Sequence, residues 1–437
     1  MTARRRRVFA LADQAVFALT SVAVVPVAAS RTTAAEFGAF ALLYGYYVLM
    51  LQLSQAAFAE PLLVQRTPAA ARATLSGAAG GALLFSLAGA GTLPLLALLF
   101  QQTPLAPACI MAAALPGALL CDTLRLGLIA EGRTGSALAV DLFWGASQCV
   151  GLMAAARAGN SLSGLLLGFT ASGVASATAA IAVAGVRPRP LQLRVWLRTY
   201  GTLSRSYLVE VLALATSTYA TLYLLGHVAG LVAAGALRSA QTVLGPAALV
   251  ANAVRVAVIV EYAKAAPGLT AAALRGRCLM TGAGLAGITA LCAAAVFALP
   301  DEAGEALFGP SWSGALAVLP AMTAYRACSA AAVGPLAGLR ALHQIRVVMW
   351  LRLSIAVLLP VGAVVGAKWA GAVGGTWGMA AVTAAELVGY TGALMLVPVT
   401  VSAEEPADRR SGVRDLPPQA SAATTYARPP EGSAVQE

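Results

Sequence analysis

Residues 76–100 read SGAAGGALLFSLAGAGTLPLLALLF, and none of these 25 residues is Asp, Glu, Lys or Arg. A helix that crosses the hydrocarbon core of a bilayer needs roughly 20 mostly apolar residues. Lipid offers no partner to backbone N–H and C=O groups, so a spanning segment of this kind must be helical. Of the 437 residues in the chain, 59% are hydrophobic and only 11% are charged, whereas a soluble domain carries about 25% charged residues. We therefore expect an integral membrane protein.

Similar apolar stretches recur along the chain and predict an all-α polytopic membrane protein with about twelve transmembrane helices in two six-helix bundles. The first stretch follows Arg4 to Arg7 and imitates a secretory signal, but it contains Asp13 and precedes many further spans. We therefore expect it to remain as the first helix. The expected spans are residues 8–30, 38–60, 76–100, 105–128, 136–156, 162–185, 206–228, 232–260, 278–299, 314–338, 347–366 and 373–399.

The expected domain organisation places a polar linker between the two halves. Apolar residues of the linker recur at helical spacing from Leu193 to Tyr200, while Arg194 and Arg198 lie on a more polar side. An amphipathic helix of this kind is expected to lie along the inner membrane surface. The end of the chain is polar and rich in Pro, Ala and Ser, which predicts a disordered cytoplasmic tail. The expected units are residues 1–186, the linker 187–205, residues 206–400 and the tail 401–437.

The distribution of basic residues among the expected loops predicts the orientation of the chain. With the N-terminus inside, nearly all loop arginines fall on one side, and the loop after the ninth span carries Asp301, Glu302 and Glu305. Short loops rich in Arg and Lys stay in the cytoplasm, so we expect both termini there. This topology accounts for most of the formal charge of +11. No loop is long enough for a nucleic-acid-binding domain, so we expect no nucleic-acid partner.

The sequence contains no recognisable site of a soluble enzyme. It has no G-x-x-x-x-G-K-[ST] motif, and its one G-x-G-x-x-G, at Gly282, Gly284 and Gly287, lies inside an expected span with no strand before it. The cysteines form no C-x-x-C pair, and His227 and His343 lie far apart, so we expect no metal site and no cofactor. A membrane-embedded glycosyltransferase would need large outer loops, and the expected outer loops are short. We therefore expect that the protein is not an enzyme.

Cationic and amide residues inside the expected spans are candidates for binding a substrate. An arginine at the bilayer centre costs at least about 2.5–3.5 kcal/mol on insertion scales, so such residues should face the interior of the bundle or extend to the membrane surface. Arg125 and Arg352 lie near cytoplasmic helix ends and could reach that surface. The candidates are Arg238, Gln241, Asn252, Arg255 and Arg326. The first four fall within about 100° of one another on one continuous helix, and the fifth lies near the membrane midplane. They predict a polar cavity, with helix–helix hydrogen bonding as the alternative interpretation.

The acids inside the spans equal the buried arginines in number, so a count does not give the sign of the cavity. By depth, the acids of the cytoplasmic half could pair with the arginines of that half, which are Arg125, Arg255 and Arg352; these acids are Asp13, Asp122, Asp141 and Glu210. Arg238 and Arg326 stay unmatched, although Glu386 could reach Arg326. A deep positive cavity suits an anionic substrate, because arginine binds phosphate through two parallel hydrogen bonds. The candidates for carrying a coupling proton or sodium ion are Asp13, Glu210 and Glu386.

Several short motifs resemble those of a known family. They are Leu11-Ala12-Asp13-Gln14-Ala15, Glu36-Phe37-Gly38, Leu307-Phe308-Gly309-Pro310-Ser311-Trp312, Gly334-Pro335-Leu336 and Gly375-Thr376-Trp377-Gly378. With them the chain resembles polysaccharide-biosynthesis proteins of the Wzx type, in the multidrug/oligosaccharidyl-lipid/polysaccharide (MOP) exporter superfamily. The resemblance implies a flippase of the bacterial inner membrane that moves a polyprenyl-pyrophosphate-linked oligosaccharide to the outer leaflet for surface polysaccharide export. It also implies two six-helix bundles around a central cavity, alternating access, and cationic cavity residues, for which Arg238, Arg255 and Arg326 are the nearest candidates.

The resemblance further implies the partners of the protein: a lipid-linked anionic saccharide, membrane lipids, and a polysaccharide polymerase or glycosyltransferases. The alternative within the same superfamily is an ion-coupled antiporter of drugs or metabolites, in which Asp13, Glu210 or Glu386 carries the coupling ion. The sequence leaves the glycan, the coupling ion and the oligomeric state open.

Overall fold

The computed structural model describes residues 16, 20, 23–65, 67–159, 161–212, 215, 217–265, 270–342 and 344–397. Every regular element in this part of the chain is a helix, so the expected all-α class is confirmed. Eight helical segments of the described residues are long and apolar enough to cross a membrane, as expected of a multi-pass membrane protein. The tail 401–437 and most of the first expected span lie outside the described residues.

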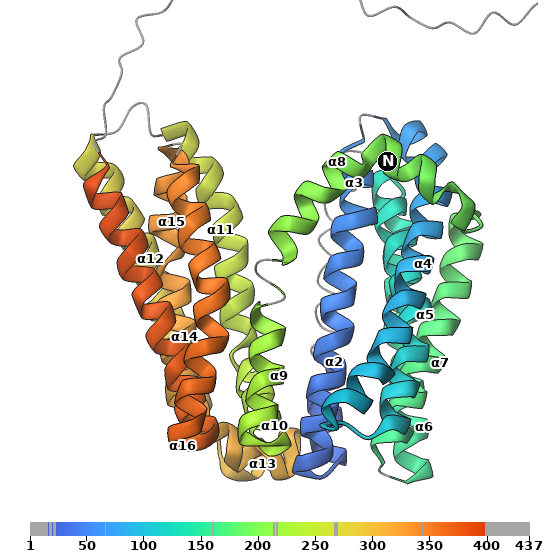
Figure 1. The fold of residues 1–437 in the computed structure, drawn as a ribbon, viewed down its shortest axis with the longest axis horizontal. Helices are drawn as coiled ribbons and strands as arrows, with labels where there is room; N and C mark the ends of the chain where they lie inside the picture. The colour runs from blue at the N-terminus through green and yellow to red at the C-terminus, as the bar shows by residue number, and fades with distance from the viewer. Residues whose placement is uncertain are drawn as a thin grey trace, which may run out of the picture. The chain divides into compact units, whose positions relative to one another are not determined.

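The first half of the chain forms long helices whose ends carry suitable capping residues. At the start of α2, Glu36 N–H donates to Thr33 Oγ1 at 3.3 Å, and Thr33 N–H donates to the Glu36 carboxylate at 3.0 Å. Gly185 ends α7 with a φ of +62°, a left-handed conformation that glycine adopts without strain. The elements, drawn from blue to green in Figure 1, are helical residues 23–31, α2 (Ala34–Ser54), η1 (Gln55–Ala59), α3 (Glu60–Leu63), α4 (Pro68–Phe100), α5 (Leu105–Ala130), α6 (Thr134–Ala158) and α7 (Leu162–Ala184).

The linker forms η2 (Pro190–Gln192) and the amphipathic helix α8 (Leu193–Val211), which packs against the first half. Trp196 is only 3% exposed and its Nε1–H donates to Ala57 O at 3.3 Å; the Ser204 hydroxyl donates to the same oxygen at 2.7 Å. Ala57 lies in the π-helical turn η1, where the altered hydrogen-bond register leaves a carbonyl to accept from side chains. The aromatic side of α8 therefore contacts protein, while Arg198 is exposed. The division of the chain at residues 187–205 stays a prediction.

The second half contains more interruptions than the first. Its elements are α9 (Ser217–Ala229), α10 (Leu231–Val243), α11 (Gly245–Ala265), α12 (Ala271–Phe297), α13 (Asp301–Phe308), η5 (Gly309–Ser311), α14 (Trp312–Ala331), α15 (Val333–Ala341) and α16 (Ile345–Leu396). Helix α16 reverses direction at Ala370 and Gly371, whose backbone angles are not helical. Its two arms pack closely, because a Cβ added at Gly366 would lie only 2.1 Å from Gly374 O. The reversal lies between the expected spans 347–366 and 373–399.

One expected span is divided in a way that matters for the candidate site. The span expected over residues 232–260 is not one helix, because α10 ends at Val243 and α11 begins at Gly245. Pro246 has no N–H to donate and its ring crowds the preceding turn, which favours a break at this point. The angular positions calculated for one continuous helix therefore do not hold across Leu244.

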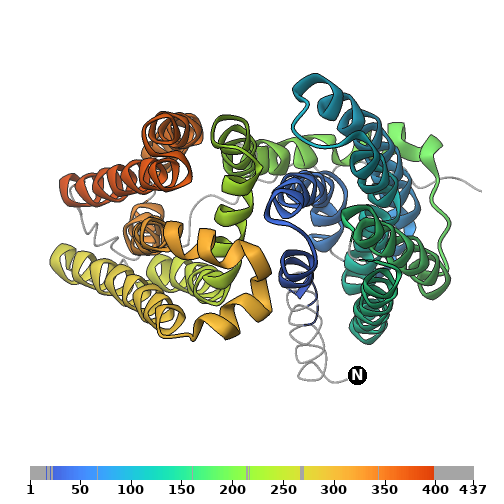
Figure 2. The same cartoon turned by 90° about the horizontal axis from the view of Figure 1, so that it is seen from below.

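The two halves meet where α2 contacts α9 and α10 (Figures 1 and 2). At Gly38 an added Cβ would lie 1.9 Å from Leu231 O, and at Gly235 it would lie 3.0 Å from the Phe37 ring. These four residues define what we call the α2–α10 contact. Both helices begin there, at the end that the predicted topology places on the outer side of the membrane. Only glycine allows the two backbones to approach this closely.

Candidate functional site

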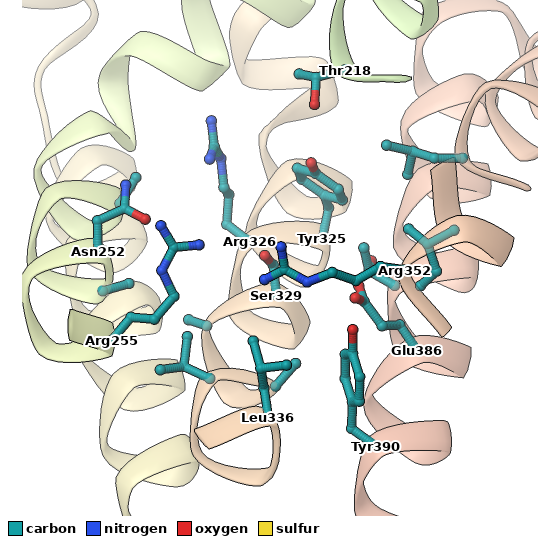
Figure 3. Close-up of a pocket in the computed structure, with 18 of the residues that line it drawn as sticks. Thr218, Asn252, Arg255, Tyr325, Arg326, Ser329, Leu336, Arg352, Glu386 and Tyr390 are labelled. Carbon is teal, nitrogen blue, oxygen red and sulfur yellow. The ribbon is translucent and has the colours of Figure 1, made fainter. Parts of the chain in front are cut away.

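A cavity of about 240 Å³ lies within the second half, and we call it the arginine cavity. Its charged lining residues are Arg255 from α11, Arg326 from α14, and Arg352 and Glu386 from the two arms of α16. Figure 3 shows the three guanidinium groups pointing into the space from three sides. Among the lining residues that the structure describes, Glu386 is the only acid. The cavity therefore carries an excess of positive charge.

Polar groups without charge complete the arginine cavity. Asn252, Tyr325 and Ser329 face the same space as the arginines, and the Tyr390 hydroxyl points toward the Glu386 carboxylate (Figure 3). Amide and hydroxyl groups of this kind donate and accept hydrogen bonds and would orient a polar ligand. The arrangement suits an anion held by guanidinium groups and surrounded by neutral hydrogen-bonding partners.

A second cavity of about 270 Å³ lies between the halves, and we call it the inter-half cavity. The first half contributes Tyr44 and Tyr47 of α2, and the second half contributes Arg238 and Gln241 of α10. Arg326 lines this cavity as well as the arginine cavity. One guanidinium group thus belongs to both spaces.

In the described part of the chain, Arg238 and Arg326 each have one unsatisfied N–H donor. The Nε of each is buried and has no hydrogen-bond partner among the described residues. The Arg238 guanidinium lies over the Tyr44 ring, 5.3 Å from its centroid, and that of Arg326 lies 5.7 Å from the centroid of Tyr325. A cation–π contact stabilises the charge without using an N–H donor. Buried donors left unpaired in a polar cavity are the kind of group that a bound ligand satisfies.

The structure distributes the sequence candidates between the two cavities. Arg238 and Gln241 line the inter-half cavity, Asn252 and Arg255 line the arginine cavity, and Arg326 lines both. The break between α10 and α11 separates the first pair from the second, so the continuous polar face expected over residues 232–260 is wrong. That these residues bind a substrate stays a prediction.

The three candidates for ion coupling have different outcomes. Glu386 lines the arginine cavity. Asp13 lies outside the described residues, and the structure describes the backbone of Glu210 in α8 but not its side chain. Arg352 and Tyr390 also line the arginine cavity and were not among the candidates from the sequence. The four-residue interval from Glu386 to Tyr390, which places both on one helix face, was a signal for the second of them.

A buried ion-pair cluster lies in the first half. Arg125 Nη2 lies 2.8 Å from Asp122 Oδ1, Arg125 Nη1 lies 3.4 Å from Asp141 Oδ2, and Gln55 Nε2 donates to Asp122 Oδ2 at 2.9 Å. The expectation that acids of the cytoplasmic half pair with arginines of that half is therefore met for Arg125, and its partners are Asp122 and Asp141. Within the described part of the chain, no group of three His, Cys, Asp or Glu residues is placed to hold a metal ion.

Comparison with solved structures identifies the architecture. A multidrug resistance MATE family transporter of the MOP superfamily, in an inward-facing conformation, matches with a TM-score of 0.65 at 12% identity, over 88% of this chain and 99% of the other. The chain has the fold of MOP-superfamily transporters. The lipid II flippase MurJ in an inward closed conformation has a TM-score of 0.62 at 12% identity, over 90% of this chain and 88% of its own. An outward-facing MATE family transporter has a TM-score of 0.52 at 11% identity, over 89% and 95% of the two chains.

Sequence comparison adds no closer relative. No protein-family model matches the chain, and no curated protein sequence matches it. The structural neighbours are transporters and a flippase, not enzymes. At these identities the likeness concerns the fold, and the substrate has to be argued from the cavities.

Proposed function

We propose that the protein is a flippase that moves a polyprenyl-pyrophosphate-linked oligosaccharide across the bacterial inner membrane by alternating access, for surface polysaccharide export. The observation that carries the proposal is the charge of the two cavities. Arg238, Arg255, Arg326 and Arg352 line them, and Glu386 is the only acid among their described lining residues. The fold shared with MurJ and the Wzx-like sequence motifs support the same class of substrate.

The positive charge selects the chemistry of the ligand. Buried arginines repel a cationic drug, and in a medium of low dielectric constant this repulsion is stronger than in water. A pyrophosphate group instead supplies several anionic oxygens, each able to accept from a guanidinium group. In this proposal the headgroup moves from the arginine cavity to the inter-half cavity by way of Arg326, while the lipid chain stays in the bilayer.

The proposal includes the cellular setting. Both termini lie in the cytoplasm, the charged headgroup enters from that side, and a polysaccharide polymerase or glycosyltransferases act before or after the transfer. The topology rests on the distribution of Arg and Lys among the loops.

The test is a transfer assay in proteoliposomes with a fluorescent, short-chain polyprenyl-pyrophosphate saccharide and a membrane-impermeant quencher. Hydrogen bonds to charged groups are worth about 1.5–3 kcal/mol, so Arg326→Ala should slow transfer about ten- to a hundredfold, and Arg326→Lys should slow it less. Arg198→Ala, at an exposed arginine of α8, is the matched control. Equal rates for wild type and Arg326→Ala at equal protein density would refute the proposal.

One observation favours an ion-coupled antiporter as the second candidate. Glu386 faces the arginine cavity beside Arg352 and Tyr390 (Figure 3), where a carboxylate could bind and release a coupling proton or sodium ion. If the protein is such an antiporter, a proton or sodium gradient accelerates export of a drug-like substrate and Glu386→Gln removes that acceleration. Transfer of the lipid-linked saccharide at the same rate with and without an ion gradient would exclude the antiporter.

A further inference from the structure

The guanidinium group of Arg238 is held by an aromatic ring from the opposite half of the protein. Arg238 belongs to α10, and the Tyr44 ring beneath it belongs to α2. Tyr44 is 3% exposed, and its ring lies 5.3 Å from that of Phe40 and 6.2 Å from that of Phe169, measured between centroids. Because other rings pack around it, Tyr44 offers Arg238 a fixed surface rather than a mobile one.

This ring contact lies directly beyond the α2–α10 contact. Tyr44 follows Gly38 by six residues on α2, and Arg238 follows Leu231 by seven residues on α10. At 1.5 Å per residue, both side chains are about 10 Å further along their helices. A separation of α2 from α10 therefore also lifts Arg238 from the Tyr44 ring.

Arg326 provides an informative contrast. Its aromatic partner is Tyr325, the preceding residue of the same helix, so that contact is independent of how the halves are placed. Arg238 alone of this pair has its aromatic partner in the other half. The inter-half cavity, which both arginines line, is thus complete only while α2 and α10 are together.

We propose that Tyr44 is a positioning residue that orients Arg238 for an anionic diphosphate headgroup and makes the affinity for that headgroup depend on the α2–α10 contact. The ring holds the guanidinium group by a cation–π interaction, which uses none of the N–H donors that could bind phosphate oxygens. A ligand that binds better to one of two conformations stabilises that conformation by the same factor. The headgroup thus binds tightly while α2 and α10 are in contact and is released when they separate. This inference rests on the proposed function.

The first measurement is binding of farnesyl pyrophosphate, a short polyprenyl pyrophosphate, to the full chain in detergent, with farnesol as the uncharged comparison. A cation–π contact corresponds to about a two- to thirtyfold change in affinity, so Tyr44→Leu should weaken binding by that factor. Tyr44→Phe keeps a ring face and should bind like wild type. Thermal unfolding of each variant shows that the protein is folded.

The second measurement reports the α2–α10 contact. Spin labels at Ala35→Cys and Val232→Cys, both exposed positions in the first turns of their helices, are placed in a background without the native cysteines. In this label pair, farnesyl pyrophosphate should increase the short-distance population in wild type and Tyr44→Phe, but not in Tyr44→Leu. Tyr325→Leu is the matched control, since it should weaken binding without changing how the ligand shifts the distances.

The outcomes separate the inference from the function on which it rests. If wild type does not bind farnesyl pyrophosphate better than farnesol, the proposed function fails and this inference fails with it. If wild type binds but Tyr44→Leu binds equally well, or Tyr44→Phe fails as Tyr44→Leu does, only the positioning role of Tyr44 is overturned. A ligand-induced shift of distances that persists in Tyr44→Leu would overturn it too.

Discussion

Gly38→Ala tests how much the α2–α10 contact contributes to the balance between conformations. The added Cβ would lie 1.9 Å from Leu231 O, and real Cβ atoms hardly ever approach within 3.0 Å. The obstructing atom is backbone, so α2 and α10 have to move apart by at least about 1 Å at this point. Overpacking of this kind costs about 1–3 kcal/mol. This strain exists only while α2 and α10 touch. The equilibrium between the touching and the separated conformations should therefore shift toward separation by roughly 5- to 150-fold.

The assay is the distance distribution of the Ala35–Val232 label pair, with the transfer rate measured on the same variants. Gly284→Ala is the matched control because an added Cβ there meets nothing within 4 Å. Gly334→Ala places a Cβ 1.9 Å from Cys278 O inside the second half, so it should lower the unfolding temperature without changing the label distances. A Gly38→Ala protein with the distances and transfer rate of wild type would refute the idea that this contact controls the conformational balance.

Three further substitutions test the packing of the halves. Arg125→Met leaves the two aspartates of the buried ion-pair cluster without this guanidinium group, and breaking a buried pair costs about 3–5 kcal/mol, so the unfolding temperature in detergent should fall sharply. Trp196→Ala removes a buried aromatic side chain between α8 and the first half and should cost about 3–5 kcal/mol, measured by the same unfolding experiment. Arg275→Ala removes donors to the last carbonyls of α16, so hydrogen exchange should accelerate at that helix end, whereas Arg198→Ala should leave it unchanged. Unaltered stability or exchange in any of these variants would contradict the role given to that side chain.

Hydropathy predicts the positions of those helices whose sequences are long, apolar and free of charge. The charge-free run at residues 76–100 lies within α4, which begins earlier because Thr67 caps it and Pro68 fits its first turn. The break before Pro246 was harder to predict, because proline alone does not decide it. Pro94, Pro116 and Pro360 all lie inside helices that continue through them. Whether a proline interrupts a membrane helix depends on whether neighbouring groups satisfy the freed carbonyl, which is tertiary information.

The site could be predicted in composition but not in arrangement. Depth in a span identified Arg326 as a cation near the midplane and Arg238 as a cation near the outer surface, where basic residues are rare, and both line a cavity. Depth also suggested that Arg352 could reach the membrane surface, but the packing of the two α16 arms turns it into the arginine cavity. The rotation of a helix about its axis is set by the helices packed against it. The mean hydropathy of a segment therefore does not predict which side chains face a cavity. Tyr44, the aromatic partner of Arg238, is distant from it in sequence, so this contact could not be predicted either.

The break between α10 and α11 also assigns different tasks to the two cavities under the proposed function. All described residues that line the arginine cavity belong to the second half, so its affinity for a headgroup does not depend on where the first half lies. The inter-half cavity is built from both halves, and only there does separation of α2 from α10 remove part of the lining. A ligand can shift a conformational equilibrium only through a difference in affinity between the two states. Under the proposed function, we therefore expect the step that couples the headgroup to alternating access to take place at Arg238, whose aromatic partner lies in the first half, and we expect Arg255 and Arg352 to serve capture.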